Sequence, residues 1–342
     1  MTRMASTMKA LVYTGPHGLE MRDLPVPVPG AGEVLIRVEA VGICGSDMHA
    51  YHGHDARRPA PLVLGHEAAG IIAEGRRAGE RVTINPLVTC GHCTACTAGR
   101  SHLCPHRQIL SMPPRPGAFA EYVCVPEGNL VPVPDGLSIE RAALAEPLAV
   151  SYHAVNQGAR LLGRPLAGAR CVVLGGGAIG FGAALVLAMQ GACEVRLAEP
   201  NAERRAVVAR SVPRIQTYAP GDAGEPGPDS ADLILDAVGS RATRSAASRL
   251  ARPGAVIVHI GLLPGEEGLD IRKITLQEII VSGSYCYTMQ EFREVVGALA
   301  DGRLGDLDWL EPRPLCDGAL AFAAIDAHQA APKIVLRPEH LL

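Results

Sequence analysis

The spacing of apolar residues changes in character along the chain. From residue 8 to 147, short apolar runs such as Glu33–Val38 and Arg81–Ile84 alternate with Gly and Pro turns, which predicts an irregular antiparallel, barrel-like domain. From residue 148 to 284, apolar strands alternate with helical periodicity, as expected for a doubly wound parallel sheet. A helix near 290–300 and a strand over Lys333–Leu336 predict that residues 285–342 return to the first domain. The expected fold class is therefore α/β.

Composition narrows the kind of protein without identifying a function. The chain has 342 residues, enough for two domains, and its net charge of −3 does not favour nucleic acid or an anionic membrane as a partner. No apolar run approaches the roughly 20 residues of a membrane helix, and Met1–Met8 lacks the apolar core of a signal peptide. We expect a frayed start, a first strand at Met8–Tyr13, and a cytoplasmic protein whose ten cysteines are reduced.

A glycine-rich motif follows the first strand of the predicted parallel sheet. The apolar run Cys171–Leu174 leads directly into G-x-G-x-x-G at positions 175–180, which opens an apolar helix. In such a loop the first glycine allows a tight turn, the second lets the backbone approach a pyrophosphate, and the third permits close helix–strand packing. The helix N-terminus faces the phosphates. The residues predicted to bind a dinucleotide here are Gly175, Gly177, Ala178, Ile179 and Gly180.

The next strand, Glu194–Ala198, ends at an acid, Glu199. A carboxylate at this point binds adenosine ribose hydroxyls and repels the 2′-phosphate of NADP, so NAD is the expected cofactor and NADP the alternative. Arg204 and Arg205 weaken the preference, since a nearby arginine can accept that phosphate. Three further residues follow later strands of the sheet, where backbone should meet the nicotinamide; they are Val238, Ile260 and Ser284. The alternative is that the G-x-G-x-x-G motif is only a glycine-rich turn in an unrelated α/β sheet that binds no dinucleotide.

Four cysteines lie close together between predicted β segments. Their spacing is C-x2-C-x2-C-x7-C, and four thiolates can close a tetrahedral zinc shell that leaves no position for substrate, so the role is structural. A nucleic-acid-binding zinc ribbon is the rival, but it usually has two separated knuckles and a basic surface. Four reduced cysteines without metal are the other alternative. The predicted zinc lobe spans 90–104, with ligands Cys90, Cys93, Cys96 and Cys104.

A second set of metal-binding residue types is scattered along the first domain. Cys44 lies in G-I-C-G-S-D-M-H, His66 and Glu67 lie in L-G-H-E, and Glu146 lies in A-E-P-L-A-V. Singly these are ambiguous, because an isolated cysteine is often a small hydrophobe and Glu146 could cap a helix. Together with the cysteine lobe and the late glycine motif, they resemble the zinc-containing medium-chain alcohol dehydrogenases over most of the chain.

Within that family the chain is most similar to the polyol and sugar-acid branch, especially to L-idonate 5-dehydrogenases. The resemblance implies a GroES-like catalytic domain over 8–147, a Rossmann cofactor domain over 148–284 and a return over 285–342. It implies a catalytic zinc held by Cys44, His66, Glu67 and Glu146, besides the structural zinc, with Asp47 orienting the His66 imidazole. The substrate is then a small secondary alcohol rich in hydroxyls, and relatives form dimers or tetramers.

The resemblance also implies roles in moving a proton. Ser46 and His49 resemble the family's relay from substrate hydroxyl through the cofactor ribose to solvent, although His49 could be only a solvated loop histidine. Glu146 is expected to contact zinc or its water. Lys333 stands near the point where relatives have a basic residue for the cofactor phosphates; a plain surface lysine is equally consistent with the sequence.

The sequence departs from the branch at the substrate pocket. Cys286 stands where polyol enzymes often have an arginine, and Arg57, Arg58 or Arg115 are candidates to replace it. A cyclitol or aminocyclitol of a biosynthetic pathway is therefore an alternative substrate. Zinc-free quinone-reductase relatives lack these ligands and are disfavoured. A non-catalytic cofactor-binding protein on the same scaffold is the alternative outside enzymes.

Overall fold

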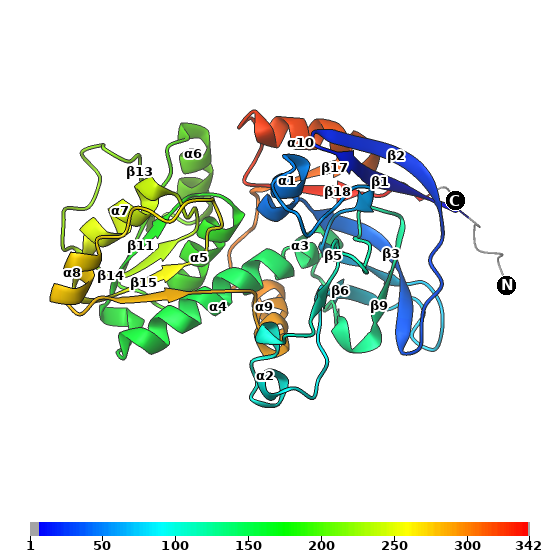
Figure 1. Ribbon diagram of the computed structural model, residues 1–342, viewed down its shortest axis with the longest axis horizontal. Helices are drawn as coiled ribbons and strands as arrows, with labels where there is room; N and C mark the ends of the chain where they lie inside the picture. The colour runs from blue at the N-terminus through cyan, green and yellow to red at the C-terminus, as the bar shows by residue number, and fades with distance from the viewer. Residues whose placement is uncertain (1–6, 341–342) are drawn as a thin grey trace. The chain divides into compact units, whose positions relative to one another are not determined.

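The computed structural model describes residues 7–340, so the predicted frayed start lies outside the described residues except for its last two positions. The chain forms two compact units, each with its own sheets. The first unit comprises residues up to Glu146, Thr288–Asp301 and the chain from Leu310, and the second comprises Pro147–Tyr287 and Gly302–Trp309 (Figure 1).

The first unit is built from largely antiparallel sheets with a few short helices. A three-stranded sheet has the order β2-β1-β4, a two-stranded sheet joins β7 to β8, and a larger sheet has the order β10-β6-β5-β3-β18-β17 with β9 also paired to β3. The strands are β1 Thr7–Gly15, β2 Gly18–Pro25, β3 Glu33–Gly42, β4 Leu62–Val63, β5 Glu67–Ile72, β6 Arg81–Ile84, β7 Leu87–Val88, β8 Gln108–Ile109, β9 Tyr122–Pro126, β10 Leu130–Pro132, β17 Leu310–Pro314 and β18 Lys333–Arg337.

One apolar core supports this unit. Leu11 of β1, Ile36 of β3, Phe119 and Phe322 are almost fully buried in the same cluster. The rings of Phe119 and Phe322 meet edge to face with centroids 5.9 Å apart, which is a preferred aromatic geometry. The helices of the unit are α1 Gly45–Tyr51, α2 Thr94–Thr97, α3 Ile139–Ala143, α9 Met289–Ala300 and α10 Gly318–Asp326.

The second unit is a six-stranded parallel sheet with the order β13-β12-β11-β14-β15-β16. Its central strands are largely apolar, as expected for a sheet covered on both faces, and every residue of β14 is buried. This strand order is the doubly wound one that binds dinucleotides at the carboxyl ends of its strands. The elements are β11 Arg170–Leu174, β12 Glu194–Ala198, β13 Ile215–Tyr218, β14 Ala231–Asp236, β15 Ala251–His259, β16 Ile280–Gly283, α4 Ala145–Leu162, α5 Ala178–Met189, α6 Ala202–Ser211, α7 Arg241–Leu250 and α8 Ile271–Leu276.

The predicted α/β fold class is confirmed, and one segment differs from the expected chain path. Residues Gly302–Trp309 belong to the second unit, although the sequence predicted that the whole stretch after residue 284 returns to the first. The cause is apolar packing, because the Trp309 indole is 2% exposed and its ring lies 5.2 Å from that of Phe181 on α5. Trp309, together with the buried Leu304 and Leu307, therefore packs this short segment into the second unit.

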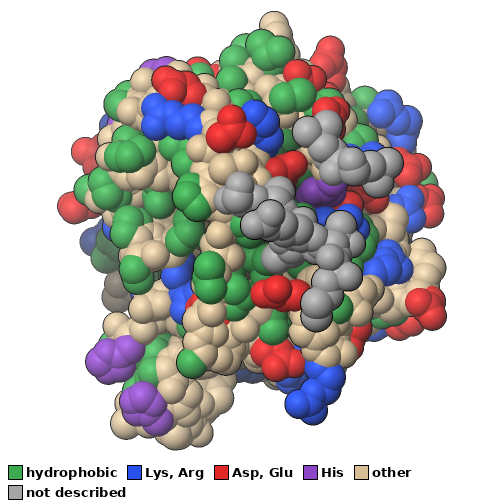
Figure 2. All heavy atoms as spheres, turned by 90° about the vertical axis from the view of Figure 1, so that its right-hand side faces the viewer, with side chains coloured by type: hydrophobic (Ala, Val, Ile, Leu, Met, Phe, Trp, Pro, Cys, Tyr) green, Lys and Arg blue, Asp and Glu red, His purple; other side chains and the backbone are tan. Residues whose placement is uncertain are grey.

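The surface carries charges of both signs. Figure 2 shows acidic and basic side chains interspersed over one face, with apolar side chains between them. No helix among residues 7–340 is long and apolar enough to cross a bilayer.

Candidate active site and metal centres

The four cysteines of the predicted zinc lobe lie together in the first unit. Cys90 and Cys93 precede α2, Cys96 lies in it, and Cys104 follows it. The Sγ atoms of Cys90 and Cys96 are 4.0 Å apart, those of Cys93 and Cys104 are 3.8 Å apart, and those of Cys104 and Cys90 are 3.6 Å apart. Four sulfurs around zinc at about 2.3 Å stand about 3.8 Å from one another, so the group fits a tetrahedral shell.

Proton chemistry in the lobe also favours a cation. A hydrogen bond from the backbone of His92 lowers the pKa of the Cys90 thiol to about 6, whereas desolvation raises the pKa of Cys96 to about 11. Four thiolates this close repel one another unless a positive ion lies between them. The lowered pKa of Cys90 favours a thiolate at one of the four positions, and the spacing of the sulfurs suits a metal ion.

A second group of ligand atoms is assembled from distant parts of the first unit. Cys44 precedes α1, His66 follows β4, and Glu67 begins β5; one ligand atom from each lies within 4.8 Å of the other two. Cys44 is half-buried, and the other two are buried. Gly42 makes room for this arrangement, because a Cβ there would stand 1.9 Å from the Glu67 carboxylate. A thiolate, an imidazole and a carboxylate are ligands typical of a catalytic zinc.

Asp47 joins the two loops that carry these ligands. Its carboxylate is completely buried, accepts a hydrogen bond from the Cys44 backbone at 3.0 Å, and lies 3.4 Å from Nδ1 of His66. Burial alone would lower the pKa of His66, but the attraction of Asp47 and Cys44 raises it well above its ordinary value. An imidazole between two anionic groups holds a cation strongly, whether a proton or a metal ion.

Lys333 lies beside this group. Its ammonium is 2.7 Å from both carboxylate oxygens of Glu67 and donates to the Ile43 carbonyl at 2.8 Å. Lys333 is only 3% exposed, so the alternative of a plain surface lysine is wrong. Burial would lower its pKa, but the charge of Glu67 more than compensates and raises it. Contact with cofactor phosphates stays a prediction, and it would compete with this buried pair.

Arg58 is a site residue whose place sequence reasoning did not find. The guanidinium is 3% exposed and donates to the Ser111 carbonyl at 3.0 Å, the Ser46 carbonyl at 2.9 Å and the Ser46 hydroxyl at 3.3 Å. Those two serines flank the zinc-type imidazole, because Ser46 Oγ lies 3.5 Å from Nε2 of His66 and Ser111 Oγ lies 3.3 Å from Nδ1. One buried arginine thus binds the Ser46 hydroxyl and the backbone carbonyls of both serines beside His66.

The remaining predicted catalytic residues are His49 and Glu146. His49 lies on α1, and its burial, together with the nearby His52, His54 and Arg58 charges, lowers its pKa despite the attraction of Asp55. Glu146 is buried in the first turn of α4, and its charge helps to raise the pKa of Lys333. It is not one of the three residues whose ligand atoms cluster, so its role as a metal ligand stays a prediction.

The three glycines of the motif have the backbone geometry that was predicted for them. Gly175 has a φ of +100°, which strongly favours glycine, and a Cβ on Gly180 would lie 1.9 Å from the Gly175 carbonyl oxygen. A Cβ on Gly177 would meet nothing within 4 Å, so open space lies over this part of the loop. No side chain caps the N-terminus of α5, which leaves its amides for a ligand. The loop therefore fits a dinucleotide.

Glu199 is tied to the glycine loop. Its carboxylate accepts hydrogen bonds from the Gly176 amide at 2.8 Å and the Asn201 amide at 2.9 Å. The neighbouring arginines differ, because Arg205 donates to the Glu199 and Pro200 carbonyls, whereas Nε of Arg204 is buried without a partner among the described residues. The contact of Glu199 with the ribose stays a prediction, and Arg204 is the arginine to test for NADP.

The other predicted cofactor residues follow strand ends that lie in register. Leu174 pairs with both Ala198 and Asp236, Asp236 pairs with His259, and His259 pairs with Gly283. All these ends form one edge of the sheet. The predicted residues beyond this edge are Gly175, Glu199, Val238, Ile260 and Ser284, and the Ser284 hydroxyl is buried without a partner among the described residues.

The arginines proposed to replace the missing substrate arginine have other partners. Arg57 pairs with Asp55 at the surface, and Arg115 pairs with Glu33 at 2.7 Å. Arg115 lines a cavity of about 580 Å³ whose lining includes none of the predicted metal ligands. Arg58, in contrast, donates a hydrogen bond to Ser46, a predicted catalytic residue. Cys286, which stands at the position of the missing arginine, has a left-handed backbone with φ of 49°.

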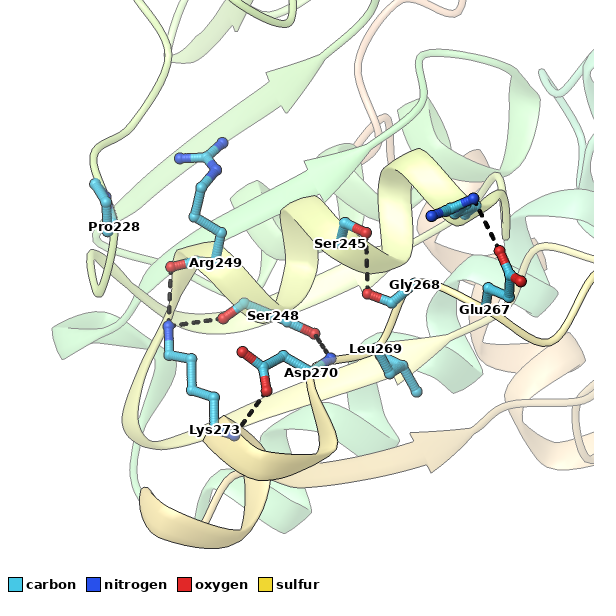
Figure 3. Close-up of a pocket in the computed structure, with 10 residues that line it drawn as sticks. Pro228, Ser245, Ser248, Arg249, Glu267, Gly268, Leu269, Asp270 and Lys273 are labelled. Atoms are coloured by element: carbon cyan, nitrogen blue, oxygen red, sulfur yellow. Dashed lines mark hydrogen bonds and ion pairs between the residues drawn. The ribbon is translucent and has the colours of Figure 1, made fainter.

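A second cavity, of about 560 Å³, lies in the second unit between α7 and α8. Figure 3 shows Lys273 bound to the carbonyls of Ser248 and Arg249 and the Glu267 carboxylate in an ion pair. None of the predicted site residues lines it.

Comparison with known proteins agrees with this geometry. Residues 30–135 match the family described as alcohol dehydrogenase GroES-like domain, and residues 178–301 match zinc-binding dehydrogenase. L-galactonate-5-dehydrogenase of Escherichia coli K12 is 32% identical over 311 residues, which cover 87% of this chain and 89% of that one. 2-Dehydro-3-deoxy-L-galactonate 5-dehydrogenase of Pseudoalteromonas atlantica is 31% identical over 342 residues, which cover 96% and 98%.

The chain therefore belongs to the zinc-containing medium-chain dehydrogenases. It is an NAD(P)-dependent dehydrogenase acting on CH–OH groups, in the sugar-acid and polyol branch of that family.

Solved structures are similar over nearly the whole chain. An alcohol dehydrogenase of Escherichia coli CFT073, crystallised with NADH, is 28% identical with a TM-score of 0.87, over 97% of this chain and 100% of that one. L-idonate 5-dehydrogenase of Escherichia coli K-12 is 26% identical with a TM-score of 0.83, over 97% and 98%. The comparisons support the branch, but not the narrower prediction of a particular similarity to L-idonate 5-dehydrogenases, since the galactonate enzyme is 32% identical.

Proposed function

We propose that this protein oxidises a secondary hydroxyl of a sugar acid or polyol, or reduces the corresponding ketone, with NAD as the preferred cofactor. The observation that carries the proposal is the Cys44–His66–Glu67 group with the Ser46 hydroxyl 3.5 Å from the His66 imidazole. The sequence resemblance to two galactonate-type dehydrogenases supports a sugar acid.

Two groups that the fold accommodates supply the bond-making chemistry: zinc lowers the pKa of a bound hydroxyl, and the nicotinamide accepts the hydride. The residues that would hold the zinc are Cys44, His66, Glu67 and Glu146. Asp47 fixes the orientation of His66, and Lys333 balances the charge of Glu67. This division leaves the cysteine lobe with a purely structural zinc.

Proton removal is assigned to α1. The Ser46 hydroxyl accepts from Arg58 and, because it has a single proton, can still donate one hydrogen bond onward. Burial lowers the pKa of His49, which favours the neutral imidazole, so His49 could serve as the base at the end of the relay.

The preference for NAD rests on Glu199. Its carboxylate lies at the end of β12 against the glycine loop, where a 2′-phosphate would meet like charge. Relatives have been crystallised with NADH and with NADP, so the choice is made by local residues. A catalytic efficiency with NADP equal to that with NAD would contradict this part of the proposal.

A substrate screen tests the function. The zinc-loaded protein is incubated with NAD and a panel of aldonates including L-galactonate and L-idonate, together with polyols, cyclitols and simple secondary alcohols. We expect NADH formation, followed at its absorbance, to be fastest with an aldonate or polyol. A preference for cyclitols would favour the biosynthetic alternative, and no turnover with any alcohol would contradict an enzymatic role.

Assembly and location are further expectations. We propose a cytoplasmic homodimer or homotetramer, as expected for this family, whose partners are a small alcohol and the cofactor. Light scattering coupled to size-exclusion chromatography measures the mass directly, and a monomer would contradict this proposal.

A further inference from the structure

A cluster of two histidines and a carboxylate lies in the first unit apart from both predicted zinc groups. One ligand atom each from His17, His52 and Asp326 lies within 4.8 Å of the other two. We propose that these three side chains form a further divalent metal site, selective for zinc-like transition ions. This inference does not depend on the proposed function.

The three residues come from separate elements. His17 lies in the turn between β1 and β2, His52 follows the last residue of α1, and Asp326 is the last residue of α10. Nε2 of His52 and Oδ1 of Asp326 are 2.7 Å apart although 274 positions separate them in sequence. The imidazole rings of His17 and His52 have centroids 5.3 Å apart. The fold therefore gathers donors that no local motif would bring together.

The backbone beneath the cluster is rigidly built. The His17 amide donates to the Tyr51 carbonyl at 2.7 Å, which joins the β1–β2 turn to the end of α1. The chain there is packed so closely that a Cβ on Gly53 would lie 2.8 Å from the Pro16 ring. His17 also holds a left-handed backbone, with φ of 58°. These contacts fix the backbone positions of His17 and His52, so ion binding costs little conformational entropy.

An aromatic floor supports the side chains. The Tyr51 ring is 8% exposed and meets His17 edge-on with centroids 4.8 Å apart, and it packs on the fully buried Phe322 of α10 at 5.3 Å. His52 and Asp326 are 28% and 43% exposed, which leaves a route for an ion and room for small side-chain shifts. The three side chains therefore rest on a packed aromatic core on one side and are open to solvent on the other.

The donor set indicates the class of ion. Two imidazoles and one carboxylate suit zinc and its first-row neighbours, whereas calcium and magnesium take oxygen ligands almost entirely. Two ligands at about 2.1 Å from one ion stand about 3.0–3.4 Å apart, so the His52–Asp326 pair needs only a slight opening. Three protein ligands leave positions for water. A bound ion would join the β1–β2 turn, α1 and α10, and α1 also carries Ser46 and His49.

Zinc content measured after equilibrium dialysis tests the proposal. The full-length, zinc-loaded protein is dialysed against buffered micromolar free zinc, beside the variants His52→Ala and Asp326→Ala. We expect wild type to hold one more zinc per chain than either variant. The matched control is His328→Asn, which removes an exposed histidine near Asp326 and tolerates its left-handed backbone; it should retain the extra ion.

A second measurement guards against variants that fold poorly. Added zinc should raise the unfolding temperature of wild type and His328→Asn, and should leave that of Asp326→Ala unchanged. Equal zinc content and equal thermal shifts in wild type and Asp326→Ala would overturn the proposal. Loss of the extra ion in His328→Asn would overturn the assignment of these three ligands.

Discussion

The two predicted zinc groups of the first unit are assembled in opposite ways. The ligands of the cysteine lobe all lie between residues 90 and 104, three of them half-buried, and they surround one short helix. The predicted catalytic group takes Cys44 from just before α1 and the adjacent His66 and Glu67 from the start of β5, and it is surrounded by the buried charges of Asp47, Arg58 and Lys333. The lobe can therefore be altered locally, whereas any change in the catalytic group disturbs a network that reaches across the unit.

The sharpest test of this difference pairs one ligand from each group. His66→Ala should lower kcat/KM by about 10³-fold or more, because Lewis-acid assistance is worth several kcal/mol in the transition state. Cys93→Ser should instead lower the unfolding temperature and the zinc content, while folded molecules remain active. Steady-state kinetics and calorimetry on both variants measure the contrast. If Cys93→Ser lost activity at full stability, the separation of structural from catalytic zinc would be wrong.

Next in size is the buried ion pair behind the catalytic group. In the zinc-free protein, Lys333→Met leaves the Glu67 carboxylate buried without this partner, which should lower the free energy of unfolding by about 3–5 kcal/mol. The matched control is Lys9→Met, whose partner Asp23 is exposed, and it should cost about 0–1 kcal/mol. Denaturant unfolding monitored by fluorescence measures both. Similar losses for the two variants would show that Glu67 does not depend on Lys333.

Arg58 tests whether the network positions the relay. Arg58→Met removes the donors that hold Ser46 and Ser111, and we expect kcat/KM to fall by about 10-fold to 100-fold because a small misplacement of a reacting group is costly. Arg57→Met is the matched control, since Arg57 pairs with the same Asp55 from the surface. Equal effects of the two substitutions would remove Arg58 from the relay.

The smallest expected effect concerns His49 and depends on pH. Because burial lowers the pKa of His49 below 6.5, the neutral imidazole should persist as pH falls until that lower pKa is reached. His49→Gln should therefore slow turnover by about tenfold near pH 6, where hydroxide cannot replace the base, and less at pH 9. The pH profile of kcat is the measurement, with His54→Gln as control. An unchanged profile would leave His49 as a solvated histidine.

The sequence predicted those parts of the site whose residues lie close together along the chain. The spacing of four cysteines and the glycines at 175–180 state their geometry locally, and parallel strands place Val238, Ile260 and Ser284 at one edge. Sequence reasoning failed where contacts are distant. Lys333 and Glu67 are 266 positions apart, and no motif around either residue predicts that the two form an ion pair. Arg58 was only one of three candidate arginines until its burial was seen, and the placement of Trp309 required the packed core.

The concentration of functional residues on helix α1 limits which insertions and deletions this site can accept during evolution. Within seven residues it carries Ser46, Asp47 and His49, with Cys44 just before it and His52 just after. Successive residues on a helix are rotated by roughly 100°, so one inserted or deleted residue would turn every later side chain away from its partner. Descendants of this sequence can exchange side chains along α1, but they must keep its length. Gaps in an alignment should therefore avoid residues 44–52 and collect in the loop after them.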